Sequence, residues 1–167
     1  DFGTRYCLVG HSERRQYHGE TDAAVATKAQ RALAAGITPI VCVGETLAER
    51  EAGCTEEVVK RQLAAVIHTN GHCISEIVVA YEPVWAIGTG VSATPDDFAR
   101  ISLLIRNTVQ IFYPKKFVEN NVAILYGGSV TSSNIKAFLY EGHADGALVG
   151  GASLDPHAFI ELIKQCT

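Results

Sequence analysis

The sequence contains no methionine, no dense run of basic residues and no long apolar segment. Lys and Arg number 14 against 18 Asp and Glu, which gives a net charge of −4. A nucleic acid is therefore not an expected partner, because its phosphates attract basic surfaces. Apolar runs such as Ile77–Ala80 fall far below the roughly 20 residues of a membrane helix. We predict no membrane partner, and the sequence opens with no recognisable signal peptide.

Paired cysteines are also missing. None of the five cysteines belongs to a Cys-x-x-Cys motif, and no two ligand-type residues have the spacing of a metal site. We predict no disulfide framework and no metal, and a reducing cytoplasm fits this pattern. The cysteines are Cys7, Cys42, Cys54, Cys73 and Cys166.

The 167 residues suffice for one globular domain with a core, but not for two. The chain is 47% hydrophobic and 19% charged, which excludes a disordered protein. The missing methionine and the opening Asp1-Phe2-Gly3 suggest that the sequence starts inside a longer one.

Short apolar runs alternate with helical patterns along the whole chain. The runs are apolar on both faces, which predicts buried parallel strands and an α/β fold with right-handed crossovers. The predicted strands are Tyr6–Val9, Ile40–Val43, Ile77–Tyr81, Ala123–Tyr126 and Ala147–Val149. The predicted helices are Asp22–Ala35, a short helix with a capping box at Thr46 and Glu49, Glu56–His68, Thr94–Phe112, Ser132–Tyr140 and Pro156–Cys166.

Chemically distinctive residues follow the end of every predicted strand. The carboxyl ends of parallel strands share one edge of a sheet, where ligands bind. We therefore expect all five strand ends to converge on one site. The residues are His11-Ser12-Glu13, Gly44-Glu45, Glu82-Pro83, Gly127-Gly128-Ser129 and Gly150-Gly151.

The last two of these segments are rich in glycine. Glycine lets backbone N–H groups approach a ligand closely, and two such loops after consecutive strands predict a phosphate cradle. The alternative is a pair of tight turns between a strand and a helix.

Glu82 and His11 are candidates for acid–base chemistry. Glu82 ends an apolar strand, so burial should raise the pKa of its carboxyl and suit it to act as a general base; the alternative is a salt-bridged glutamate. A helix that begins at His11 would keep the imidazole neutral and able to donate to a carbonyl; the alternative is a capping or core histidine. The apolar segment 83–90, with the only tryptophan, predicts a lid, or else a loop buried against a helix.

Four segments together resemble the triosephosphate isomerase family, in its order and spacing over essentially the whole chain. They are Gly10-His11-Ser12-Glu13-Arg14-Arg15, the run from Ala80 to Gly90 around Glu82-Pro83-Val84-Trp85, Tyr126-Gly127-Gly128-Ser129-Val130 and Leu148-Val149-Gly150-Gly151-Ala152-Ser153-Leu154.

This resemblance implies a (β/α)₈ barrel that interconverts D-glyceraldehyde 3-phosphate and dihydroxyacetone phosphate in glycolysis and gluconeogenesis. It implies a cytoplasmic homodimer that needs no cofactor. Carried over by motif, Glu82 is the base, His11 the electrophile and Glu13 a supporting acid. Phosphate-binding positions carried over in the same way are Gly88, Ser129, Gly150 and Gly151.

The sequence shows five strand–helix units where the family has eight. We therefore expect residues 1–167 to form a single incomplete barrel domain without the three N-terminal units. In the family those units carry an Asn and a Lys that contact substrate, and the loop that reaches into the dimer partner. Two other hypotheses remain open. One is a non-catalytic, phosphate-binding half-barrel fragment, or a half-barrel that pairs with another chain. The other is a different phosphate-binding barrel isomerase, which the segment Glu82–Trp85 disfavours.

Overall fold

The structure is a computed structural model that describes residues 2–71, 73–87 and 92–166. Its centre is a five-stranded sheet in which each strand pairs in parallel with the next one along the chain. The strands are β1 (Tyr6–Val9), β2 (Thr38–Val43), β3 (Val78–Tyr81), β4 (Ile124–Tyr126) and β5 (Gly146–Ala147).

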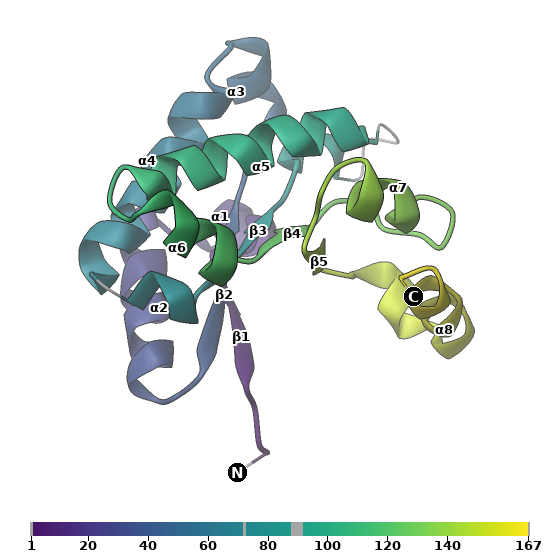
Figure 1. Cartoon of the computed structure of the whole chain (residues 1–167), viewed down its shortest axis with the longest axis horizontal. Coiled ribbons are helices and arrows are strands. Elements are labelled where there is room, and N and C mark those ends of the chain that lie inside the picture. Colours follow the sequence, from purple (N-terminus) through teal and green to yellow (C-terminus); the bar gives the residue numbers. More distant parts are fainter. Residues whose placement is uncertain (1, 72, 88–91, 167) are drawn as a thin grey trace.

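Helices follow the strands and form an outer layer. In this layer α2 packs against α4, α4 against α5, and α5 against α7, so the helices take the same order as the strands (Figure 1). The α-helices are α1 (Ser12–His18), α2 (Asp22–Ala34), α3 (Leu47–Glu51), α4 (Thr55–Asn70), α5 (Pro95–Gln110), α6 (Lys115–Asn121), α7 (Ile135–Tyr140) and α8 (Pro156–Lys164). Short 3₁₀ helices are η1 (Cys73–Glu76), η2 (Val84–Ala86) and η3 (Gly151–Leu154).

The strand order distinguishes two kinds of parallel α/β fold. In a doubly wound sheet the order reverses at a switch point, whereas in a (β/α)₈ barrel it follows the chain. Here the order is β1-β2-β3-β4-β5 without reversal. The fold therefore agrees with the predicted α/β class and with part of such a barrel.

The core lies between the sheet and the helical layer. Strand residues such as Val41, Tyr81 and Ile124 are at most 1% exposed, and they meet helix residues such as Leu63 and Phe98 that are equally buried. Removing side chains of this size from water stabilises the fold by roughly 1.5–3 kcal/mol each. This core holds the central strands in register and so fixes the relative positions of their carboxyl ends.

The expectation that every strand is buried is wrong for β1. Tyr6 is 58% exposed and Leu8 is 47% exposed, because β1 pairs only with β2 within the part of the chain that the structure describes. The N-terminal end of β1 also projects away from the helical layer (Figure 1). At the other edge β5 is only two residues long and begins one residue before the predicted strand.

Several helix boundaries follow from local capping chemistry. Thr46 and Thr94 each form a capping box, with Glu49 and Asp97 respectively, and the Asp155 side chain caps α8. Two short helices do not match the predictions: α6 was not foreseen, and α7 begins at Ile135 rather than at Ser132. Residues 132–134 instead form a turn in which the Asn134 amide accepts from the N–H of Thr131.

Candidate active site

A cavity of about 620 Å³ opens at the carboxyl ends of the strands. It brings together the predicted site residues His11, Glu13, Glu82, Ser129 and the Gly150-Gly151 pair. These residues follow β1, β3, β4 and β5, so segments up to 140 residues apart in sequence meet at one place. Three backbone hydrogen bonds extend the strand pairing to this edge of the sheet. They run from Glu82 N–H to Val43 O, from Gly127 N–H to Tyr81 O and from Leu148 N–H to Tyr126 O.

His11 and Glu82 face each other directly in this cavity. The His11 Nε2 atom lies 2.9 Å from Glu82 Oε1, which is a hydrogen-bonding distance. The imidazole is partly exposed, whereas the Glu82 carboxylate is buried. One partner is thus open to a ligand and the other is shielded from water.

Backbone geometry defines the tautomer that a neutral His11 adopts. His11 is the N-cap of α1, and its Nδ1 atom accepts a hydrogen bond from the Glu13 N–H at 3.4 Å. Because Nδ1 accepts, the proton of the neutral ring belongs on Nε2. His11 therefore caps a helix, as one alternative held, and also presents an Nε2–H donor to the cavity.

Ser12 provides two further polar contacts of the Glu82 carboxylate. Its N–H donates to Oε2 at 2.9 Å and its hydroxyl donates to Oε1 at 3.3 Å. Burial raises the pKa of the Glu82 carboxyl above its ordinary value, while His11 and these two Ser12 bonds oppose the rise. The net direction agrees with the expectation for a general base at a strand end.

Two loops that line the same cavity present unpaired backbone donors. Within the described residues, the N–H groups of Ser129, Gly150 and Gly151 donate to no protein acceptor. The first loop is held by Asn134, whose amide donates to Ser129 O at 2.9 Å, and the second by Ser153, whose hydroxyl donates to Gly150 O at 2.7 Å. Both loops are thus fixed while their N–H groups remain available to an anion.

Glu13 also lines the cavity, but it is not tied into the network around Glu82. Its carboxylate has no ion pair or hydrogen-bond partner among residues 2–71, 73–87 and 92–166. Gly88, which the resemblance placed among the phosphate ligands, lies outside the described residues, as does the rest of segment 88–91.

The first part of the predicted lid is held by Arg50, a residue that does not line the cavity. Trp85 is 8% exposed, and the Arg50 guanidinium lies 4.0 Å from the centre of its ring. Arg50 also forms ion pairs with Glu45 at 3.3 Å and with Asp97 at 3.0 Å. The residues before and after segment 88–91 are therefore connected through one arginine.

The end of β2 does not reach the cavity, so the prediction that all five strand ends converge there is wrong at this strand. Glu45 is completely buried, and the Tyr81 hydroxyl donates to its carboxylate at 3.1 Å. Gly44 is held against the backbone of Glu82 instead of facing the cavity. The end of β2 therefore packs against the backbone of Glu82 outside the cavity.

Cys42 lies in β2 next to Glu82, and it is fully buried. Burial, together with the nearby Glu82 carboxylate, raises the pKa of the thiol far above its ordinary value. The thiol therefore stays protonated, which fits a packing role for Cys42 and not that of a nucleophile.

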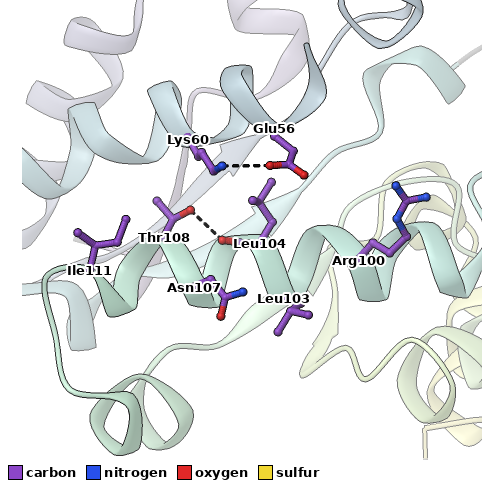
Figure 2. A pocket seen from close by; sticks show the side chains of 8 residues that line it. All are labelled: Glu56, Lys60, Arg100, Leu103, Leu104, Asn107, Thr108 and Ile111. Carbon is purple, nitrogen blue, oxygen red and sulfur yellow. Dashed lines mark hydrogen bonds and ion pairs between the residues drawn. The ribbon is translucent and has the colours of Figure 1, made fainter. Parts of the chain in front are cut away.

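Two other hollows of the molecule lack the predicted site residues His11, Glu82, Ser129 and Gly150. One, of about 680 Å³, lies between α1, α3 and Trp85. The other, of about 480 Å³, is an outer groove between α4 and α5 (Figure 2). In that groove Lys60 pairs with Glu56 at 3.0 Å, and the groove has neither a histidine nor a glycine loop among its lining residues.

Sequence reasoning missed Ser12 as a partner of Glu82. The N–H and the hydroxyl of Ser12 both donate to a carboxylate 70 residues away. Gln62 was also missed, although a signal was present: it is a polar residue in the apolar stripe of a predicted helix, between Val59 and Leu63.

Two searches of the described residues gave negative findings. In the part of the chain covered by residues 2–71, 73–87 and 92–166, no cluster of three or more His, Cys, Asp or Glu side chains could hold a metal ion. No helix within those ranges is long and apolar enough to cross a membrane.

The sequential parallel sheet, with its cavity at the carboxyl ends of the strands, defines an α/β protein of the (β/α)₈-barrel class. Comparison with known sequences then identifies the family. The family model described as triosephosphate isomerase matches residues 1–166, and the chain belongs to this family.

Three curated relatives carry the name triosephosphate isomerase. The protein of Paracidovorax citrulli is 63% identical over 163 residues, covering 98% of this chain and 64% of the relative. That of Albidiferax ferrireducens is 62% identical, covering 99% of this chain and 66% of the relative. That of Delftia acidovorans is 62% identical, with coverage of 98% and 64%. The chain therefore spans just under two thirds of the length of these relatives.

Proposed function

We propose that the complete protein containing this chain is a triosephosphate isomerase that interconverts D-glyceraldehyde 3-phosphate and dihydroxyacetone phosphate. The observation that supports this most strongly is the His11–Glu82 pair, 2.9 Å apart in a cavity that is also lined by loops whose N–H groups have no acceptor among the described residues. A phosphate held by those N–H groups would place the reacting carbons of a three-carbon substrate in the same cavity as the pair.

The proposed chemistry is a proton transfer between adjacent carbons. The Glu82 carboxylate removes the proton from the carbon next to the carbonyl, while the Nε2–H of His11 donates to the carbonyl oxygen. His11 then relays the hydroxyl proton of the resulting enediolate from one oxygen to the other, and Glu82 returns its proton to the neighbouring carbon, so the reaction needs no external oxidant or reductant. For this step Glu82 must leave the His11 Nε2–H and the two Ser12 donors that it contacts in the present structure, which frees the Nε2–H for the carbonyl oxygen.

The remaining roles are proposals by family resemblance and position. Ser129, Gly150 and Gly151 hold the substrate phosphate through their N–H groups, Gly88 joins them, and Glu13 acts as a supporting acid. We also infer that the complete protein is a cytoplasmic homodimer. The described cysteines are all free thiols, which supports a reducing compartment.

An activity assay on the complete protein tests this proposal. Both triose phosphates should serve as substrates in coupled assays, and the reaction in deuterium oxide should introduce solvent deuterium at the carbons that exchange protons. A complete protein that binds a phosphoglycolate-like analogue but shows no turnover would contradict it. That result would favour the non-catalytic, phosphate-binding alternative.

A further inference from the structure

Gln62 is a buried polar residue on the largely apolar inner face of α4. It lies on α4 among Val58, Val59, Leu63 and Val66, and only 5% of the residue is exposed. A buried side-chain amide is costly unless its donor and acceptor are both satisfied. The partners of Gln62 therefore indicate what the residue does.

Both partners of the amide belong to one glycine. The Gly44 N–H donates to Gln62 Oε1 at 2.8 Å, and Gln62 Nε2 donates to Gly44 O at 3.2 Å. Strand β2 ends at Val43, so Gly44 is the first residue beyond the sheet. The side chain of Gln62 thus supplies the backbone pairing that a neighbouring strand would otherwise give.

Gly44 in turn touches the backbone of Glu82. A Cβ atom on Gly44 would lie 1.7 Å from Glu82 O, so no other residue fits without displacing that carbonyl. The N–H of Glu82 is held from the same strand end, because it donates to Val43 O at 2.8 Å. The Glu82 main chain therefore rests on a segment whose position depends on the Gln62 amide.

We infer that Gln62 is a positioning residue for the proposed base: it fixes Gly44, and Gly44 fixes the backbone from which the Glu82 carboxylate extends. This inference rests on the proposed function. Gln62 does not line the cavity that contains His11 and Glu82, so it acts through Gly44 and not by contact with substrate.

Asn70 offers a matched control on the same helix. It is also a buried side-chain amide, 9% exposed, and it donates to the backbone carbonyls of Val66 and Ala26. Asn70 forms no contact with Gly44 or Glu82 in these bonds. Gln62→Met and Asn70→Leu therefore both remove buried amide bonds from α4, but only the first releases Gly44.

Steady-state kinetics of the two variants in the complete protein separate positioning from stability. Both variants should lower the melting temperature. Only Gln62→Met should lower kcat, by at least about tenfold, with KM within about threefold, because a base displaced by a fraction of an ångström reacts slowly. Gln62→Glu, which keeps an acceptor for the Gly44 N–H, should recover part of the loss. A Gln62→Met enzyme with the kcat of Asn70→Leu would overturn the inference.

A second measurement does not depend on turnover. Among the described residues, the ionisable side chains that act on the Glu82 carboxyl are those of His11 and Cys42. Carbon-13 NMR of the Glu82 carboxyl should show its titration midpoint rising by about half a unit or more in Gln62→Met, because a displaced carboxylate loses its Ser12 donors. Asn70→Leu should leave the midpoint unchanged. If the wild-type complete protein lacks turnover, the proposed function fails, and this comparison still decides the positioning role: equal midpoints in both variants would overturn it.

Discussion

The Nε2 atom of His11 and the Oε1 atom of Glu82 lie 2.9 Å apart, although the residues are separated by 71 positions in sequence. The contact exists because β1 and β3 flank β2 in a parallel sheet, so that their carboxyl ends point to the same edge. The pair joins a partly exposed donor to a buried acceptor, and Glu82 carries two distinct predictions.

Shortening the base should slow the reaction more than it weakens binding. Glu82→Asp removes one methylene and withdraws the carboxylate by about 1 Å, a misplacement that can cost roughly a hundredfold in rate. In the complete protein we expect kcat to fall by about that factor and KM to change only slightly. Steady-state kinetics in both directions measure this. A kcat within twofold of the wild type would remove Glu82 from the role of base.

The raised pKa of Glu82 leads to a prediction about how stability depends on pH. Burial raises the pKa of the Glu82 carboxyl, so the folded protein holds the carboxyl proton more tightly than the unfolded chain does. The resulting stabilisation is complete below the unfolded glutamate pKa of about 4.3 and is lost as pH rises through the folded value. Glu82→Gln cannot lose a proton, so its stability relative to wild type should increase with pH over this window.

Urea unfolding of the wild-type and Glu82→Gln proteins at several pH values from 4 to 8 tests whether the difference in their free energies of unfolding changes with pH in this direction. Glu57→Gln is the control, because Glu57 is an exposed glutamate on α4, and its curve should run parallel to that of the wild type. A Glu82→Gln curve that also runs parallel would show that burial does not raise the pKa of Glu82.

A side chain introduced into the glycine loops should weaken anion binding without unfolding the protein. A Cβ atom at Gly150 would meet no atom within 4 Å, so Gly150→Val should fold normally and place its side chain in the way of a ligand. We expect the inhibition constants of inorganic phosphate and of a phosphoglycolate-like analogue to rise at least about tenfold, with Gly150→Ala intermediate. Unchanged inhibition constants would contradict the phosphate cradle.

Residues 1–167 expressed alone should aggregate and show no isomerase activity. Tyr6 and Leu8 on β1 are half exposed, and β1 and β5 each pair with one strand among the described residues, which leaves open edges for another chain. Leu8→Lys should reduce the aggregation, because a charge on an edge strand opposes pairing. Size-exclusion chromatography with a coupled assay measures both effects. A soluble, active monomer would contradict the expectation of an incomplete barrel.

Local patterns in the sequence predicted most of the fold. The apolar runs located β2, β3 and β4 to within two residues, and the capping residues Thr46, Thr94 and Asp155 marked the starts of three helices correctly. The exposure of β1 was not predictable in this way, since its composition matches that of the buried strands and only its lack of a second neighbour distinguishes it.

The sequence indicated which residues gather at the candidate site, but not which of them contact each other. His11, Glu82 and the glycine loops stand out because they follow strand ends, and one cavity contains them. The bonds from Ser12 to Glu82 and the departure of Glu45 from the cavity depend on long-range packing. Periodicity carries no information on which of two neighbouring strand ends turns inward.

The buried thiol of Cys42 has a practical consequence for experiments on this chain. Cys7 and Cys166 are exposed and should react quickly with an alkylating reagent, whereas Cys42 is fully buried and stays protonated. Modification of Cys42 therefore requires a transient opening of the sheet beside Glu82. Its labelling rate would report how often that opening occurs, with the two exposed cysteines as internal standards.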